Sequence, residues 1–476
     1  MRAPANARPR GRPARGSPAD RLTPPVGSDL VPPTGVPHDR YVDGVAVTPS
    51  RGAAASTRLR VALVYRNFNL SGSLERDTVM LAQGLAKLGV EVHCYCNPRA
   101  RTIEPPGIRF HDVRPLLQSR SRVGYAVECG SFALAATAAV RRDRRGYDIV
   151  DVCGASAWEQ DVITVHAVTK ADRWRWAEEA AGVYGAPHLR ARLAPALRPQ
   201  IAVAEAIERR QIRSRRFRRL IAVTPGIRDD LLRIHGVEPD VVDVVPPPVD
   251  VAPFLPAAGR ERETRQRLGI GPGDHAILFV GHDFERKGLG EAIAAVSALP
   301  AETHLIVVGG GDEARFRRVA ERLGVAGRVH FVGRTEDPAG FYRAADSFVL
   351  PTRHDPWGIP LIEAMAAGLP IVTAAAAGAA EAVRQAGAGL VLEDASARPL
   401  REALESLLRD ADLRAAMAER GPAAAVPFDV VNHARRTLAV YELARLERSR
   451  AAEGALREPA LQPATASGPP TELARR

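Results

Sequence analysis

The chain has 476 residues, of which 46% are hydrophobic and 25% charged, an ordinary globular balance that excludes a wholly disordered or collagen-like protein. At roughly 150 residues per domain, this length predicts two or three domains. The formal net charge is +11, but residues 1–58 and 449–476 hold +5 and +1 of it, which leaves +5 for the long middle. Steering of an anionic ligand explains this mild excess of positive charge as well as nucleic-acid binding does. The charge therefore gives no reason to expect a specific nucleic-acid partner, and we expect none.

The cysteines and the lengths of the apolar runs indicate in which cellular compartment the protein works. The four cysteines form no C-x-x-C pair, which argues against both a disulfide-dense scaffold and a structural zinc site. No uncharged apolar run reaches the roughly 18 residues of a membrane helix, and the first thirty residues lack a signal-peptide stretch. We therefore expect a cytoplasmic protein, with the inner face of the membrane as the place of any peripheral contact.

Both ends of the chain are expected to be disordered arms. Residues 1–58 contain ten of the 38 prolines and little periodicity, and residues 449–476 are similar in character. Such segments bury too little apolar surface to offset their ordering entropy. Between the arms, short apolar runs alternate with helical patterns, which is typical of parallel α/β sheets.

The first predicted domain covers residues 59–242. It opens with a buried strand at 60–65, a turn-rich loop at 69–73 and a helix whose leucines share one face until Gly89 stops it. Further strands are predicted at 90–94, 148–152, 162–166 and 220–224.

A proline cluster at 243–250 predicts a linker into a second domain, which covers residues 243–425. Its strands are predicted at 276–281, 304–308, 329–332, 347–350 and 370–373. A last helix within 426–448 has no strand after it and is expected to cross back to the first domain. The predicted fold is α/β, with two doubly wound Rossmann-like domains and a ligand at the carboxyl ends of the strands, in the cleft between the domains.

Two carboxylates mark the segment 355–372. Asp355 follows a strand, and Glu363 lies eight positions later in a helix that is predicted to begin near Ile359. A carboxylate that accepts two hydrogen bonds suits vicinal hydroxyls, and Gly358 allows backbone to approach a ligand. The alternative is a structural role, in which the helix dipole alone favours a glutamate near the helix start.

Two adjacent cations mark the segment 279–288. Arg286 and Lys287 follow a strand and precede a helix, an arrangement that suits a diphosphate. The alternative is a pair of solvated cations. The diphosphate interpretation is favoured because glycines bracket the segment and because this is one of only three lysines in the chain.

Taken together, these motifs resemble the family 4 retaining glycosyltransferases, which have the two-domain GT-B fold. Residues 355–372 match the pattern E-x-F-G-x-x-x-x-E followed by A-M-A-x-G-x-P-V, with Asp355 in place of the first Glu and Trp357 in place of Phe. Residues 281–288 match G-R-x-x-x-x-K-G, except that His282 replaces Arg. The run F-x-R-K-G most resembles the lipopolysaccharide-core glucosyltransferase branch.

The resemblance implies a role for each matching residue. Arg286 and Lys287 would hold the donor diphosphate, Glu363 the ribose hydroxyls and Asp355 a hydroxyl of the donor sugar, while His166 would lie near that sugar. His166 could equally be a hydrogen-bonded structural residue. The remaining donor-binding positions are Gly72, Ser73, Gly281, Gly333, Arg334, Thr335, Gly358 and Ile359.

The function implied is retaining transfer of a hexose from a UDP- or GDP-sugar to a hydroxyl acceptor, without metal or other cofactor. The expected acceptors are a cell-envelope glycolipid, a polysaccharide or a small glycoside. Two alternatives remain open: a sugar-nucleotide epimerase, which would need acid–base carboxylates that do not stand out in the first domain, and a non-catalytic sugar-nucleotide scaffold. The arginine run 209–219 predicts a solvated face or, as the alternative, contact with an anionic membrane surface.

Overall fold

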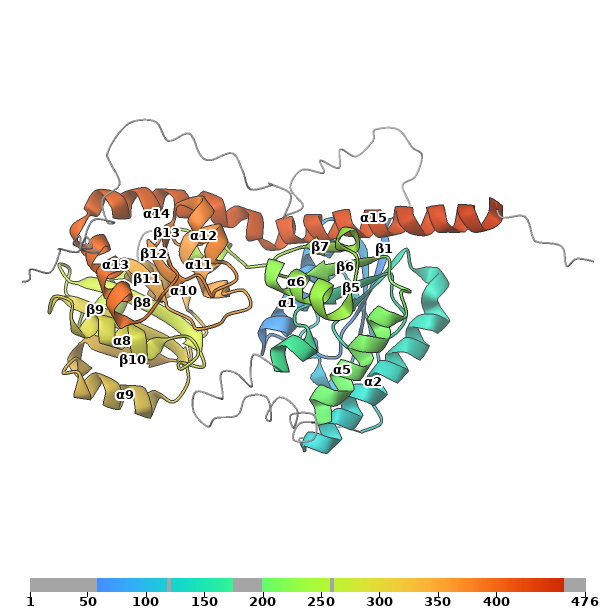
Figure 1. Ribbon diagram of the computed structural model, residues 1–476, viewed down its shortest axis with the longest axis horizontal. Coiled ribbons are helices and arrows are strands. Elements are labelled where there is room, and N and C mark those ends of the chain that lie inside the picture. Colours follow the sequence, from blue (N-terminus) through green and yellow to red (C-terminus); the bar gives the residue numbers. More distant parts are fainter. Residues whose placement is uncertain (1–57, 118–120, 174–198, 257–260, 458–476) are drawn as a thin grey trace, which may run out of the picture. The chain divides into compact units, whose positions relative to one another are not determined.

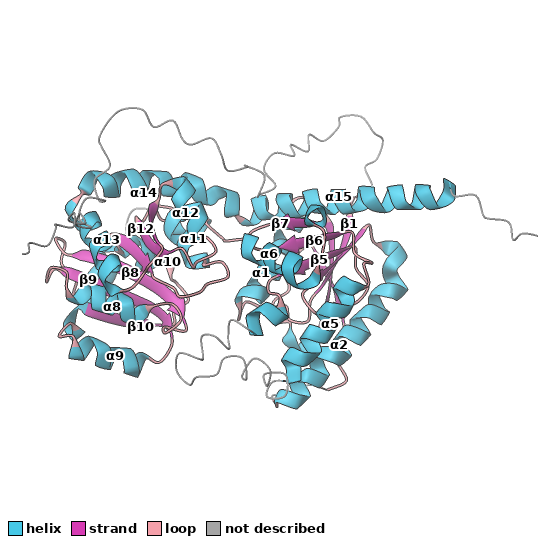
Figure 2. Ribbon diagram, viewed as in Figure 1, coloured by secondary structure: helices cyan, strands magenta, loops and turns pink. Residues whose placement is uncertain are grey.

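A computed structural model describes residues 58–117, 121–173, 199–256 and 261–457 (Figure 1). The predicted N-terminal arm lies outside these residues except for Arg58, and so do residues 458–476 of the predicted tail. The described residues form two parallel sheets. Each sheet is flanked by helices, as the secondary-structure colouring of Figure 2 shows.

The first sheet has seven parallel strands in the order β3-β2-β1-β4-β5-β6-β7. Its strands are β1 (Arg60–Val64), β2 (Glu91–Cys96), β3 (Ile108–Asp112), β4 (Ile149–Cys153), β5 (Val162–Val165), β6 (Arg219–Ala222) and β7 (Val242–Val244). Its helices are α1 (Ser73–Lys87), α2 (Arg122–Asp143), α5 (Pro199–Arg213) and α6 (Pro225–His235). The last two residues of β7 lie in the segment predicted as linker, so the first sheet reaches two residues beyond the expected boundary.

The second sheet has six parallel strands in the order β10-β9-β8-β11-β12-β13. Its strands are β8 (His275–His282), β9 (Thr303–Gly310), β10 (Val329–Gly333), β11 (Ser347–Leu350), β12 (Ile371–Ala374) and β13 (Gly389–Leu392). The accompanying helices are α7 (Glu261–Leu268), α8 (Leu289–Ser297), α9 (Glu313–Arg322), α10 (Ala339–Ala344), α11 (Ile359–Ala366), α12 (Ala380–Ala386), α13 (Ala397–Arg409) and α14 (Ala411–Ala425).

Each sheet has a switch point. This is the place between two neighbouring strands where the connection after one strand runs toward one edge of the sheet and the connection after the other runs toward the opposite edge. In the first sheet it lies between β1 and β4, and in the second between β8 and β11. Ligands of doubly wound sheets bind outside the carboxyl ends of the strands at such points. The two switch points therefore locate the candidate site.

The last helix, α15 (Val430–Arg457), packs on the first sheet's domain although it follows the second in sequence. Ala434, Val440, Tyr441 and Ala444 are fully buried in one core cluster with residues of α1, β1 and β2. The helix starts at Val430, within the predicted segment, and runs nine residues past Arg448, into the segment expected to be a disordered tail.

Helix α2 is the one described helix that is long and apolar enough to cross a membrane, counting from Val123 to Gly146. Half of its apolar window is buried inside the protein. Phe132, Ala136 and Val140 pack in a core cluster with β1 and β4, as expected of a helix that covers a sheet.

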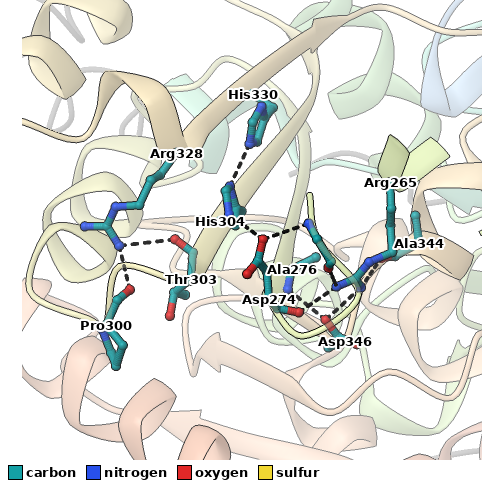
Figure 3. A network of polar contacts seen from close by, with 11 residues as sticks. Arg265, Asp274, Ala276, Pro300, Thr303, His304, Arg328, His330, Ala344 and Asp346 are labelled. Atoms are coloured by element: carbon teal, nitrogen blue, oxygen red, sulfur yellow. Dashed lines mark hydrogen bonds and ion pairs between the residues drawn. The ribbon is translucent and has the colours of Figure 1, made fainter. Parts of the chain in front are cut away.

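A polar network lies at the amino ends of the second sheet's strands (Figure 3). It is therefore at the opposite end of β8 and β11 from the carboxyl ends, where a ligand is expected. The Arg265 guanidinium donates to the carbonyls of Ala344 at 3.1 Å and Asp274 at 2.6 Å and to the Asp346 carboxylate at 3.0 Å. Asp346 also accepts from the backbone N–H of Ala276 at 2.7 Å. One half-buried guanidinium thus joins α7 to the starts of β8 and β11.

Replacing Arg265 by Ala is expected to destabilise the protein by about 1–3 kcal/mol, because partly buried carbonyls and one carboxylate lose their donor. The urea midpoint measures this loss. Arg262→Ala, which removes an exposed guanidinium of the same helix, is the matched control and should change stability by less than about 0.5 kcal/mol. Equal midpoints for the two variants would refute the structural role of the network.

Candidate functional site

The loops that follow β8 and β11 meet at the second switch point. Arg286 and Lys287 lie in the loop after β8, and Asp355 lies in the loop after β11. The Arg286 Nη1 donates to the carbonyl of His354 at 2.6 Å, and the Arg286 carbonyl accepts from the backbone N–H of Arg353 at 2.9 Å. Two segments that are 68 residues apart are therefore held together at the edge where a ligand is expected.

Lys287 and Asp355 form a buried ion pair between Nζ and Oδ2. Each side chain is only 9% exposed. Burial lowers the pKa of Lys287, and the Asp355 carboxylate opposes that shift. The structure thus brings the predicted diphosphate cation together with the predicted sugar-binding carboxylate.

Glycine is required at two places in these loops. Gly288 has φ 78°, and a Cβ there would collide with the carbonyl oxygen of Pro351. Gly358 has φ 92° and immediately precedes α11, which begins at Ile359 as predicted. Both positions combine left-handed backbone with close packing, which other residues rarely tolerate.

Glu363 lies in α11 and is 7% exposed. The Tyr342 hydroxyl, from α10, donates to its Oε2 at 2.7 Å. Burial raises the pKa of Glu363, while the hydrogen bond from Tyr342 acts in the opposite direction. Tyr342 orients one carboxylate oxygen, and among the described residues no donor engages Oε1.

The other predicted donor-binding residues of this domain lie at strand ends. Gly281 is buried near the end of β8, and a Cβ there would be 3.2 Å from Cγ of Lys287. Gly333 ends β10, and the exposed Arg334 and the half-buried Thr335 follow it. His282, which stands in place of the family's Arg, flanks Gly310 together with Arg334.

In the first domain, the predicted residues lie near the other switch point. Gly72 caps the start of α1, and Ser73 is the first residue of that helix. His166 follows β5, and its side chain is 7% exposed. Its Nε2 contacts Asp77 Oδ2, and its Nδ1 lies 3.5 Å from the Cys153 sulfur. Both ring nitrogens therefore face groups of the same domain.

Several groups escaped the sequence analysis. The first domain does hold buried carboxylates, Asp77 near the start of α1 and Asp151 in the middle of β4, although none stood out in the sequence. Asp77 lies within the leucine-rich helix and Asp151 within an apolar strand, so neither belongs to a recognisable motif. Tyr342 is likewise 21 residues from Glu363, and no spacing rule connects them.

Two family profiles cover both domains. The profile described as Glycosyltransferase Family 4 matches residues 74–253, and that described as Glycosyl transferases group 1 matches residues 260–424. The D-inositol 3-phosphate glycosyltransferase of Kineococcus radiotolerans is 30% identical over 424 residues, which cover 80% of this chain and 92% of that protein. The chain therefore belongs to family 4 of the glycosyltransferases, as its motifs predicted.

The predicted resemblance to the lipopolysaccharide-core branch is also confirmed. Lipopolysaccharide glucosyltransferase WaaG of Escherichia coli is 34% identical over 221 residues, which cover 45% of this chain and 59% of that protein. The chain spans about half the length of most of the curated relatives it matches. The crystal structure of WaaG has a TM-score of 0.62 and 26% identity, and the match covers 79% of this chain and 98% of that one.

The GT-B fold is confirmed by a second neighbour. Anabaena Alr3699/HepE, solved in complex with UDP and glucose, has a TM-score of 0.57 and 16% identity, covering 81% of this chain. At this identity the likeness concerns the fold alone.

Proposed function

We propose that the protein is a retaining hexosyltransferase that uses a UDP- or GDP-sugar and transfers the sugar to a hydroxyl of a cell-envelope glycolipid, polysaccharide or small glycoside. The observation that carries this proposal is the meeting of Arg286, Lys287 and Asp355 at one switch point, with Glu363 in the helix that follows. Cations there suit a diphosphate, and a buried carboxylate suits ribose hydroxyls.

The names of the relatives narrow the substrate class. WaaG is a lipopolysaccharide glucosyltransferase, and the Kineococcus protein acts on D-inositol 3-phosphate. Glucose is therefore the first donor sugar to test. Polyhydroxylated acceptors that carry phosphate are the first acceptors.

In this proposal, positively charged side chains of the protein stabilise the negative charge on the departing diphosphate. Lys287 and Arg286 would meet the negative charge that develops on the leaving group, and the burial of Lys287 would strengthen its contact. The proposal therefore includes no metal ion and no other cofactor. Contact with an anionic membrane surface through the exposed arginines between Arg209 and Arg216 is a further part of it, and would place the enzyme at the inner face of the membrane. Arg219, at the end of the run, instead pairs with Asp243.

A nucleotide panel tests the donor site. Thermal unfolding is measured with UDP, GDP, ADP and dTDP, since a ligand at 100 times its Kd stabilises by about 2.7 kcal/mol. We expect one nucleotide to stabilise the wild type and to bind Glu363→Gln about 10–100-fold more weakly, because a charge-assisted hydrogen bond is lost. Glu402→Gln, an exposed carboxylate on α13, is the matched control and should bind as the wild type does.

Turnover separates the classes of function. A transferase consumes the sugar nucleotide only when an acceptor or water receives the sugar, and EDTA should leave its rate unchanged. An epimerase would convert the donor without releasing nucleotide, and a scaffold would bind without consuming it. No stabilisation by any of the four nucleotides would refute the donor site.

A further inference from the structure

Helix α2 has an exposed side that is entirely apolar. Val123, Val127 and Leu134 are 67%, 44% and 60% exposed, and they share one side of the helix because they lie four and seven positions apart. Ala138 continues this side and is also exposed. From Val123 to Val140 the only charged residue is Glu128, which is buried. A surface helix normally turns polar side chains to water, so this apolar side indicates a partner.

The loop after β3 widens the exposed apolar surface. Leu116 is 88% exposed, and its backbone N–H donates to the Ser131 hydroxyl of α2 at 3.1 Å. Because Ser131 lies one turn after Val127, Leu116 is held beside the exposed side of the helix. We call the set of these apolar side chains the α2 face: Leu116, Val123, Val127, Leu134 and Ala138.

Helix α5 packs along α2 and runs in the same direction (Figure 1). Near the start of α5, a Cβ on Gly130 of α2 would lie 3.6 Å from the side chain of Val203. Seven residues further along each helix, both contact Trp158. Its backbone N–H donates to the Thr137 hydroxyl at 2.9 Å, and the Arg210 guanidinium lies 4.8 Å from its ring centre. The carboxyl ends of α2 and α5 are therefore at the same end of the helix pair.

Exposed arginines gather at that shared end. Arg141 pairs with Glu159, and Arg142 pairs with Asp143. The other exposed arginines there form no ion pair with a described residue: Arg145, Arg213, Arg215 and Arg216. The α2 face is thus continuous with a cluster of cations that have no acidic partner.

We propose that the α2 face and this cationic end form one docking surface for an anionic membrane, in which the apolar side chains enter the lipid interface and the arginines meet lipid phosphates. The inference rests on the membrane contact in the proposed function and adds an apolar anchor to it. Salt screens the contact of arginines with lipid, but it does not weaken the burial of apolar side chains. A second copy of the chain, docked by a two-fold axis, would cover the apolar face but bring no free acid to the arginines.

Cosedimentation with lipid vesicles tests the apolar anchor. The vesicles are equimolar phosphatidylcholine and phosphatidylglycerol, at low and at high salt. We expect the wild type to bind at both, and Val127→Ser/Leu134→Ser to bind about 10–100-fold more weakly at both, because two apolar side chains are lost from the interface. Leu323→Ser/Leu446→Ser is the matched control and should bind as the wild type does, since it replaces leucines that are 42% and 48% exposed on other elements.

A second pair of substitutions tests the cationic end. Arg213→Gln/Arg216→Gln should bind the same vesicles about 10-fold more weakly at low salt, because each arginine near an anionic surface contributes about 1 kcal/mol. At high salt it should bind as the wild type does. Vesicles of phosphatidylcholine alone should bind the wild type and this variant equally.

A wild type that binds no vesicles would overturn the proposal. So would equal binding by Val127→Ser/Leu134→Ser and its control, or binding that high salt abolishes, since the arginines alone would then account for the contact. A wild-type dimer in sedimentation velocity that Val127→Ser/Leu134→Ser dissociates would assign the α2 face to a second copy of the chain. Sugar transfer is measured separately, without vesicles, on a soluble acceptor. Its failure would refute the proposed transferase and leave the docking surface standing.

Discussion

Replacing Lys287 by Met is expected to lower kcat for sugar transfer by about 10²–10³-fold, which corresponds to removing one preorganised group from the developing charge. Met has a similar length and no charge. In the proposed mechanism the Lys287 ammonium neutralises the diphosphate as the sugar leaves. Single-turnover kinetics with the donor identified by the nucleotide panel measure the chemical step directly.

The ion pair with Asp355 requires a control for stability. Lys287→Met leaves the buried Asp355 carboxylate without its partner, which should lower the unfolding midpoint as well as the rate. The double variant Lys287→Met/Asp355→Asn removes both charges and should recover most of the midpoint. If the double variant also regains the rate, Lys287 has only a structural role and the proposed leaving-group contact is wrong.

The alternation of apolar runs and helical patterns was enough to predict most of the parallel strands. Strands β3 and β13 escaped because they carry little signal of their own. β3 alternates apolar with charged or polar residues and is not fully buried, and β13 begins with a glycine and is only partly buried along its whole length. β7 was hidden by the prolines that follow it, which resemble a linker. Short edge strands depend on their neighbours for stability, and sequence periodicity does not show neighbours.

The residues of the candidate site also fall into those that the sequence predicts and those that only the structure shows. Motif spacing located Arg286, Lys287 and Glu363 because each lies at a strand end or a helix start. It could not show that Lys287 pairs with Asp355, since the strand order β8-β11 alone brings residues 68 positions apart into contact. The Asp77–His166–Cys153 cluster depends on three elements of the first sheet's domain, so no local pattern reveals it.

The contact between α1 and α15 gives the largest expected effect on stability. Gly84 lies where the two helices meet, and a Cβ there would be 2.6 Å from the carbonyl oxygen of Val430 and 2.7 Å from Cβ of Ala434. Gly84→Val should therefore force the helices apart and cost about 3 kcal/mol or more. Urea unfolding followed by circular dichroism measures the loss.

Lys87→Val is the matched control for Gly84→Val, because it places the same β-branched residue in α1 at an exposed position. Its cost should stay within the helix-propensity difference of about 0.7 kcal/mol. Gly84→Val should also weaken the contact of Tyr441 with Asp151 and of His433 with Pro246, because both contacts depend on the position of α15 against the first domain. Nucleotide binding should persist, because Lys287, Asp355 and Glu363 belong to the other sheet. Equal urea midpoints for Gly84→Val and Lys87→Val would contradict the packing of α15 on the first domain.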